Sequence, residues 1–422
     1  MQVLKNIVVF FVALGLFSCS SRITDNKIEI SDYKYDIIDY DTIKDKMSIE
    51  GTLNVGVLLP LSGKASEVGQ GLQNAMFLAV EDLQNNKLML TFYDTLGTQE
   101  GAEIAMKKAK NDGVNLVLGP LTNEEVAGVS RIALSNNIPV VSFTTSPQVL
   151  QKGIYSIGML NGEQIERVLS YAQKEGRKRV VVLVPDNNSG LNVVKSALMS
   201  VQNKDISIVK VGFYNPNTLD FTNLVNSIVG NPEELDFDAV LIADGGNKLK
   251  SMVSMFAYND VMSPSVMFMG TSSWDNTNLS KETVLYNGIY PMVSKSYNNY
   301  FSGKYQKIYG QLPKSIYSLA YDSVLLASVL SSQEIDNIEE ALTSENGFIG
   351  VNGFFKVLPT GQSRHSLDMY KVTSKGAKVI EKANKDVDYE ENEIDIRYIP
   401  YDALPEFYGK NNSEVLKWLY NN

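Results

Sequence analysis

A regular alternation of short apolar runs with amphipathic segments is the feature that most limits how this chain folds. It begins at Leu53 with LNVGVLLPLSG, an apolar run that ends in Pro60 and Gly63. The next stretch, SEVGQGLQNAMFLAVEDLQNN, has apolar residues at helical spacing. A buried parallel strand is a continuous apolar run, whereas a helix that covers a sheet is apolar on one face. Strands and helices that alternate in this way predict a parallel, doubly wound sheet.

The alternation runs through two blocks of similar size. The first contains the strands LMLTFYDT, VNLVLGP and IPVVSFT, and the second starts near residue 163 and ends with the strand SVMFMGT. Two blocks predict two α/β lobes, and ligands bind such sheets beyond the carboxyl ends of their strands. After residue 287, two helical segments precede a β-hairpin around the turn Pro359, Thr360 and Gly361.

The N-terminal stretch MQVLKNIVVFFVALGLFSC predicts export. It joins a basic residue, Lys5, to an apolar run too short for a membrane-spanning helix, which needs about 20 residues. Its last four residues, LFSC, resemble a bacterial lipobox, in which the Cys becomes lipidated. An ordinary cleaved signal with an incidental Cys stays the alternative. Cys19 is the only Cys of the chain, which favours the lipidated form.

The expected location is therefore the periplasm, with the chain held to a bacterial membrane by a lipid on Cys19. Ser20 follows this Cys, as in lipoproteins sorted to the outer membrane, so we favour that membrane. Residues 20–50 are polar and rich in Asp and predict a tether between the lipid and the folded part.

Composition excludes several functions. A net charge of −10 with a pI near 4.9 argues against nucleic acid as a partner. A single His, His365, leaves little material for a zinc site or a His-based triad, and the sequence has no Gly-rich phosphate loop. We therefore expect no enzyme activity, no metal and no cofactor. His365 lies beside the hairpin turn, where we expect it to be a solvated surface residue.

The chain resembles type I periplasmic binding proteins, the Leu/Ile/Val-binding class that serves ABC importers. The matching segments are VGVLLPLSGKASEVGQGLQNAMFLAVED, LVLGPLTNEEVAGVS and NIPVVSFTTSP. This resemblance implies two lobes joined by a three-strand hinge that close on a ligand. Lobe 1 then spans about 51–162 plus 288–332, and lobe 2 about 163–287 plus 333–380. The signal peptide (1–18) and tether (19–50) precede this domain of residues 51–380, and an acidic tail (381–422) follows it.

A narrower resemblance points to the penicillin-binding-protein activators, which are lipoproteins that stimulate peptidoglycan synthases. It is carried by VLGPLTNEEV, LIADGGNKLK, FMGTSSWDN, KYQKIYGQLPKSIYSLAYDSVLLA and GFIGVNGFFKVLPTGQSRHSLDMYKV. It implies a non-catalytic regulator whose partner is a penicillin-binding protein. The alternative is a solute receptor whose partner is an ABC permease, with an amino acid or related small molecule in the cleft. A scaffold with neither activity is a third possibility.

Candidate ligand-binding residues in lobe 1 follow the third and fourth strands. In amino-acid receptors of this fold, small polar groups in these loops hold the ligand carboxylate. The corresponding residues here are Thr122, Asn123, Thr144, Thr145 and Ser146. The alternative for Thr122 and Asn123 is helix capping, which two acidic residues in the following turn favour.

Candidates in lobe 2 depart from the amino-acid receptors. The loop that usually supplies an acid for the ligand ammonium has Thr271 or Ser272 at that place, and Ser189 takes the place of an aromatic residue. Asp244 is a possible acceptor, or it bonds only to the glycine turn after it. Trp274 is either a platform for a flat polar ligand or a side chain that packs its own loop. The lobe 2 loops therefore predict a repurposed or vestigial cleft.

Overall fold

The computed structural model describes residues 52–202, 204–275, 278–332 and 337–383, without the side chains of residues 296 and 297. The expected signal peptide, Cys19, the tether and nearly all of the acidic tail lie outside these residues.

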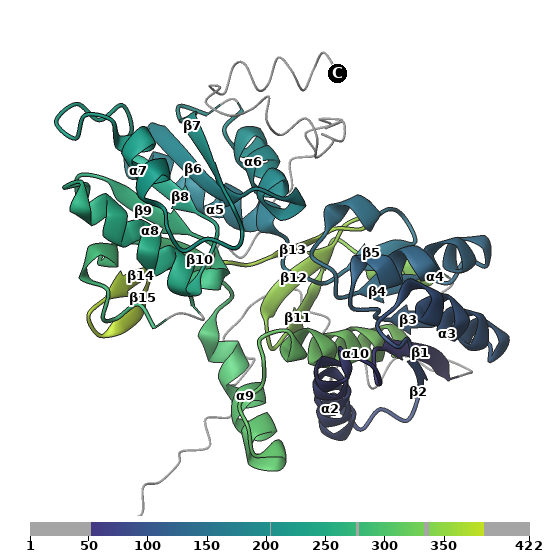
Figure 1. The fold of residues 1–422 in the computed structure, drawn as a ribbon. Coiled ribbons are helices and arrows are strands. Elements are labelled where there is room, and N and C mark those ends of the chain that lie inside the picture. The colour runs from purple at the N-terminus through teal and green to yellow at the C-terminus, as the bar shows by residue number, and fades with distance from the viewer. Residues whose placement is uncertain (1–51, 203, 276–277, 333–336, 384–422) are drawn as a thin grey trace, which may run out of the picture. The chain divides into compact units, whose positions relative to one another are not determined.

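Sheet A is a parallel sheet of five strands in the order β2-β1-β3-β4-β5. The strands are β1 (Leu53–Leu59), β2 (Leu88–Asp94), β3 (Leu116–Leu118), β4 (Val140–Ser142) and β5 (Ile154–Ser156). The helices are α2 (Ser66–Leu83), α3 (Gln99–Asn111), α4 (Asn123–Ser135) and α10 (Tyr317–Ser331). Val57 of β1 packs in one core with α2 and α10, and its neighbour Leu58 packs in another with α3 and α4 (Figure 1). The predicted doubly wound parallel sheet is confirmed here.

Sheet B has seven strands in the order β15-β14-β10-β9-β8-β6-β7. They are β6 (Arg179–Pro185), β7 (Ser207–Tyr214), β8 (Ala239–Ile242), β9 (Met267–Gly270), β10 (Ile289–Met292), β14 (Asp368–Thr373) and β15 (Gly376–Glu381). Its helices are α5 (Asn161–Lys174), α6 (Asn188–Ser200), α7 (Thr222–Val229) and α8 (Gly246–Tyr258). Alternate residues of β6 face opposite cores, with Val182 among α5 and α6 residues and Leu183 among α7 and α8 residues.

Sheet B differs from the predicted parallel sheet at one edge. Strand β14 pairs antiparallel with β10, and β15 pairs antiparallel with β14. A parallel neighbour needs a long crossover, usually a helix, whereas β14 is reached by a short connection and followed by a tight turn. Short connections of this kind permit the antiparallel arrangement.

A third sheet, sheet C, contains the predicted hairpin. Strand β12 (Gly353–Val357) pairs antiparallel with β13 (Ser363–His365) around the turn at Pro359, and β11 (Phe348–Gly350) flanks β12. Phe355 of β12 lies in the same core as α2 and α10. The remaining described elements are α9 (Lys295–Tyr309), α11 (Ile338–Leu342) and three short 3-10 helices, η2 (Pro147–Val149), η3 (Ser272–Trp274) and η4 (Thr283–Leu285).

Three crossovers connect the part built on sheet A with the part built on sheet B. The first crossover, residues 157–160, leads from β5 to α5, and the second, residues 293–294, leads from β10 to α9. The third crossover, residues 366–367, leads from β13 to β14. The number of crossovers agrees with the predicted three-strand hinge, whereas the third crossover lies at residues 366–367 and not near residue 332, because β12 packs in the core of α2 and α10.

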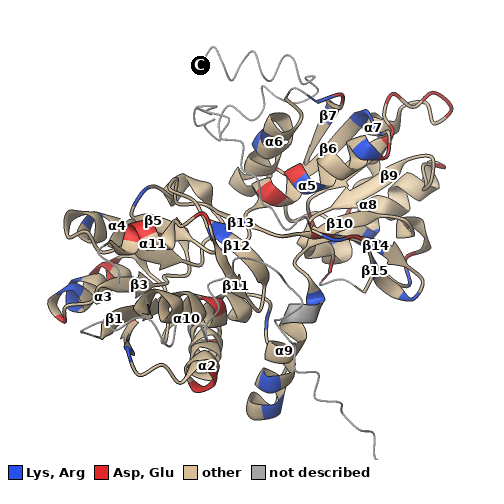
Figure 2. Cartoon of the chain, turned by 180° about the vertical axis from the view of Figure 1, so that it is seen from behind, with Lys and Arg blue, Asp and Glu red and all other residues tan. Residues whose placement is uncertain are grey.

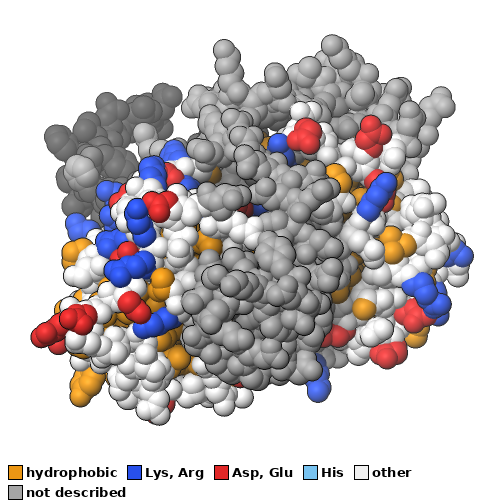
Figure 3. All heavy atoms as spheres, turned by 90° about the horizontal axis from the view of Figure 1, so that it is seen from above, with side chains coloured by type: hydrophobic (Ala, Val, Ile, Leu, Met, Phe, Trp, Pro, Cys, Tyr) orange, Lys and Arg blue, Asp and Glu red, His pale blue; other side chains and the backbone are white. Residues whose placement is uncertain are grey.

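Charged side chains of both signs are interspersed over the described surface. Figure 2 shows Lys and Arg among Asp and Glu on helices of both sheets, and the face in Figure 3 has the same mixed pattern with scattered apolar side chains. Such mixing is typical of a solvated surface. Within the described ranges, none of the helices has the length and apolar character needed to span a bilayer.

Candidate functional site

The candidate residues of lobe 1 lie in the loops after β3 and β4, at one edge of the parallel sheet. Thr122 precedes α4, and its hydroxyl accepts a hydrogen bond from the backbone N–H of Glu125 at 3.3 Å. In return, Glu125 Oε2 accepts from the Thr122 N–H at 2.9 Å. This reciprocal capping box satisfies two helix N–H groups. The Thr122 side chain is therefore occupied by its own helix.

The loop after β4 is bonded to the start of α4. The Thr144 hydroxyl donates to Asn123 Oδ1 and accepts from the Ser146 N–H at 3.1 Å. Thr144 is buried, whereas Asn123 and Thr145 are exposed. The Ser146 hydroxyl donates to Gln148. The structure thus brings Asn123, Thr144 and Ser146 together, whereas Thr145 is exposed.

The candidates of lobe 2 after β6 and β8 have different surroundings. Ser189 is an exposed residue in the first turn of α6, a helix capped by Asn187. Asp244 follows β8 and accepts hydrogen bonds from the Tyr214 hydroxyl and the Gly245 N–H, both at 2.8 Å. The Lys248 ammonium lies 3.3 Å from the same carboxylate.

Asp244 therefore has partners for its charge within the chain. Burial and the neighbouring Asp244 carboxylate raise the pKa of Tyr214, which keeps its hydroxyl a donor to that carboxylate. The bond to the glycine turn, which the sequence alternative gave as the only one for Asp244, is present together with the contacts to Tyr214 and Lys248. A ligand ammonium at this place would have to compete with Lys248 for the carboxylate.

The loop after β9 holds the other lobe 2 candidates. The hydroxyls of Thr271 and Ser273 lie 2.9 Å apart, and the Ser272 N–H donates to Gln164 Oε1 of α5 at 2.7 Å. Trp274 has 0% exposure and donates its indole N–H to the Ile242 carbonyl at 3.1 Å. A side chain without exposed area presents no stacking face, so the structure favours the packing interpretation of Trp274.

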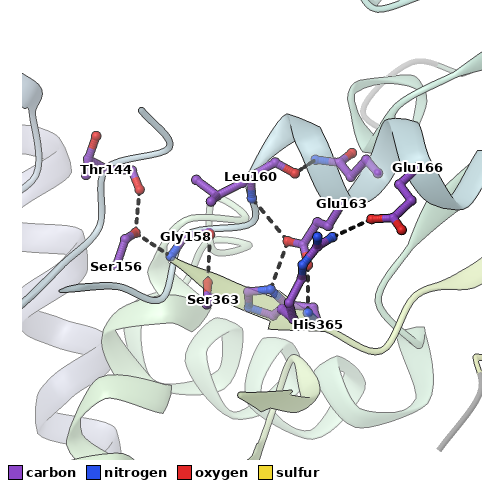
Figure 4. Close-up of polar contacts among 10 residues, drawn as sticks. Thr144, Ser156, Gly158, Leu160, Glu163, Glu166, Ser363 and His365 are labelled. Atoms are coloured by element: carbon purple, nitrogen blue, oxygen red, sulfur yellow. Dashed lines mark hydrogen bonds and ion pairs between the residues drawn. The ribbon is translucent and has the colours of Figure 1, made fainter. Parts of the chain in front are cut away.

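A polar cluster that the sequence analysis missed lies at the crossovers (Figure 4). Glu163, in the first turn of α5, accepts from the Leu160 N–H at 3.1 Å and from the His365 N–H at 2.6 Å. Its Oε1 also lies 2.9 Å from His365 Nδ1. The Ser363 hydroxyl donates to the Gly158 carbonyl at 3.2 Å. The first crossover is thereby bonded directly to β13.

The expectation that His365 is solvated is wrong. The residue is 6% exposed, and its ring stacks on Phe355 with centroids 5.7 Å apart. In β13, residues alternate between inward and outward positions, so Ser363 and His365 share the buried face while Arg364 points away. Strand alternation was the available signal, but the adjacent Pro-Thr-Gly turn suggested a surface.

Two further features bear on the chemistry of the described residues. A pocket of about 120 Å³ lies beside Trp274, Asp275, Tyr290 and Lys295, well below the about 300–1,000 Å³ of typical small-molecule sites. Lys295 and Asp275 form an ion pair of 2.5 Å within it. In the part of the chain that is described, no three His, Cys, Asp or Glu side chains are grouped to hold a metal ion.

This chain is similar to known proteins in sequence and in fold. The sequence profile of a family described as periplasmic binding protein covers residues 52–377. The chain is 24% identical over 187 residues to the Leu/Ile/Val-binding protein BraC3 of Rhizobium johnstonii, which covers 42% of this chain and 51% of that protein. It is 23% identical over 281 residues to the penicillin-binding protein activator LpoA of Histophilus somni, which covers 64% of this chain and 46% of that protein.

The chain therefore spans about half the length of these curated relatives. Among solved structures, it resembles an ABC transporter substrate-binding protein from Sphaerobacter thermophilus with a TM-score of 0.64 and 18% identity. That alignment covers 79% of this chain and 98% of the other. At such low identity the likeness concerns the fold.

Proposed function

Because this chain belongs to the family of periplasmic binding proteins, of type I, we propose that it is a non-catalytic activator of peptidoglycan synthases. In this proposal it is a lipoprotein of the periplasm, held to the outer membrane through Cys19. Residues 1–18 form its signal peptide, residues 19–50 its tether, and the partner is a penicillin-binding protein.

The proposal rests on one observation: candidate residues near the strand ends already have partners within the chain or are buried. Thr122 caps its own helix, Asp244 is paired with Lys248, and Trp274 is buried. An α-amino acid needs partners for both an ammonium and a carboxylate, and an unpaired buried charge costs several kcal/mol. A cleft whose charged groups already have partners suits a regulator better than an amino-acid receptor.

The extent of the relatives supports the same choice. The match to the penicillin-binding protein activator covers 64% of this chain, against 42% for the match to the Leu/Ile/Val-binding protein.

The test is reconstitution with a penicillin-binding protein from the same organism. The purified chain, carrying its lipid, is mixed with the detergent-solubilised synthase, and the rate of glycan-strand polymerisation from a lipid-linked precursor is followed. We expect association in a pull-down and a several-fold higher rate. The heat-unfolded chain is the control and should leave the rate unchanged. If the two proteins neither associate nor show stimulation at micromolar concentration, the proposal is wrong.

The second candidate function is a solute receptor for an ABC permease, and two exposed hydroxyls favour it. Thr145, in the loop after β4, and Ser189, in the first turn of α6, are both exposed. Calorimetric titration with amino acids, peptides and related small molecules separates the functions. A micromolar ligand whose affinity falls in Thr145→Ala and Ser189→Ala establishes the receptor, whereas stimulation of the synthase that survives both substitutions supports the activator.

A further inference from the structure

The first two turns of α5 hold the end of β13 and the third crossover that follows it through three side chains. Glu163 binds the backbone and ring of His365, Glu166 pairs with Arg364 at 2.7 Å, and Arg167 Nε donates to the Leu367 carbonyl at 3.0 Å. Only the first of these contacts is buried, with 4% of the Glu163 side chain and 2% of the His365 side chain exposed. Glu163 also accepts from Leu160 in the first crossover, so one carboxylate joins the first crossover to the last residue of β13, directly before the third crossover.

Three elements, α5, α10 and β12, surround the His365 side chain. On α5 the charged groups are Glu163 and, through Arg364, Glu166, while Arg167 pairs with Glu381 of β15 at 2.7 Å. On α10, Asp322 acts on the imidazole electrostatically. Strand β12 presents the apolar ring of Phe355. Both close titratable neighbours of the imidazole are thus carboxylates, and the excess of negative charge favours an imidazolium.

A buried carboxylate is stable only when its charge is balanced and its lone pairs accept hydrogen bonds. The N–H groups of Leu160 and His365 supply hydrogen bonds, and a protonated His365 supplies the charge. We propose that the Glu163–His365 pair is a conformational clamp on the hinge, which ties the first crossover to the end of β13, where the third crossover begins, while His365 is protonated and loosens when that proton is lost.

The electrostatics give the direction of the pH dependence. Burial by itself lowers the pKa of His365, but Glu163 and Asp322 raise it, so that it lies above its usual value of 6.5. A group whose pKa is raised by folding contributes stability that is complete below its unfolded pKa and is lost as the pH rises through its folded pKa. The clamp is therefore closed in mildly acidic solution and weakens in alkaline solution.

The sole His makes the first test direct. In protein purified without a histidine tag and labelled at the imidazole, one set of ring signals appears in the NMR spectrum. We expect these signals to titrate with a midpoint above 6.5 in the wild type and at a lower pH in Glu163→Gln, because Asp322 and the Ile157 backbone then oppose burial without the Glu163 carboxylate. The matched control is Glu166→Gln, which removes the exposed pair one turn further on and should keep the wild-type midpoint. A wild-type midpoint at or below 6.5, or one unchanged by Glu163→Gln, would overturn the proposal.

The second test measures the strength of the two backbone hydrogen bonds that Glu163 accepts. Hydrogen exchange at the backbone amides of Leu160 and His365 is followed between pH 6 and 10 and corrected for intrinsic exchange. Hydrogen bonds to a charged acceptor are stronger than neutral ones, so we expect protection of both amides to fall about tenfold or more in Glu163→Gln. In the wild type, the protection of both amides should fall over the same pH range in which the imidazole signals titrate. Glu166→Gln should keep both properties.

His365→Gln provides a second variant in case Glu163→Gln folds poorly. It keeps a polar side chain at the buried position but has no proton to lose. We expect the protection of Leu160 in this variant to be independent of pH between pH 6 and 10. A pH dependence equal to that of the wild type would show that His365 does not control the clamp.

Discussion

Asp322 of α10 is a buried carboxylate that organises the turn between β11 and β12. It accepts hydrogen bonds from the Val351 N–H at 2.7 Å, the Asn352 N–H at 3.0 Å and Asn352 Nδ2 at 2.8 Å. A Cβ added at Gly350 would lie 2.2 Å from Asp322 Oδ1, so the turn follows the carboxylate closely. Burial raises the pKa of Asp322 to about 6, although these hydrogen bonds and His365 lower it in part.

This pKa leads to a prediction for Asp322→Asn. Between about pH 4 and 6 the folded wild type keeps a proton on Asp322 that the unfolded chain has released, so the free energy of unfolding falls as the pH rises. A shift of about two pKa units corresponds to about 1–3 kcal/mol over this range. Asn has no such proton. We expect the stability of the wild type relative to the variant to decrease by this amount from pH 4 to 6, measured by urea unfolding.

A difference between the two proteins that stays constant from pH 4 to 6 would contradict the raised pKa. The substitution itself should lower stability at every pH, because the NH₂ group of Asn would face one of the N–H groups that donate to the carboxylate in the wild type. Only the change of the difference with pH tests the pKa.

At the scale of elements, the contact between α2 and α10 depends on a glycine. A Cβ added at Gly71 of α2 would lie 2.0 Å from Cζ of Tyr317, at the start of α10. The Tyr317 ring is 2% exposed and packs beside Tyr305 with centroids 5.7 Å apart, so it has little room to move. Close helix packing therefore explains a glycine inside α2.

We expect Gly71→Ala to lower the free energy of unfolding by about 1–3 kcal/mol, as overpacking of a core does. The matched control is Gly303→Ala in α9, where an added Cβ meets nothing within 4 Å and the residue is exposed. That change should raise the free energy of unfolding by about 0.5–1 kcal/mol through helix propensity. Denaturant unfolding of both variants gives the signs. Equal effects of the two substitutions would rule out the steric explanation.

The elements were predictable from sequence where their period was long and regular. Helices such as α2 and strands such as β6 carry clear patterns over many residues. Strand β5 has only three residues, too few to show a pattern, and β14 leaves the hairpin to pair with β10. The apolar alternation of β14 predicts a strand but carries no information about the partner strand.

The candidate site was less predictable, for a physical reason. The loops after β3, β4, β8 and β9 could be placed because parallel strands end at a common edge. Whether Asp244 is free for a ligand depends on distant partners that the sequence does not reveal, such as Tyr214. Glu163 and His365 are 202 residues apart, so only the folded crossovers show that they pair.

At the scale of the whole molecule, three crossovers carry any change in the relation of the two lobes. Sheets A and B each have helices on both faces and cores that they do not share. A lobe with its own core moves as a body, and the short connections absorb the change. The bonds that Glu163 makes to the first crossover and to the end of β13 therefore lie where a hinge is most sensitive to a single pair.

The last prediction concerns how the proposed regulator reaches its partner, and the change is Cys19→Ala. Acyl chains contribute about 0.8 kcal/mol of membrane affinity per buried CH₂ group, so two or more chains anchor a protein stably. We expect the wild type in the membrane pellet after fractionation and the variant in the soluble periplasmic extract. Ser21→Ala, two residues further on, leaves Cys19 in place and should stay in the pellet.

The released Cys19→Ala variant should still stimulate the purified synthase but fail to do so in cells, because the tether supplies a high local concentration near the membrane. A Cys19→Ala protein that remains in the pellet would contradict the anchor, and one that is soluble yet active in cells would contradict the role given to the tether.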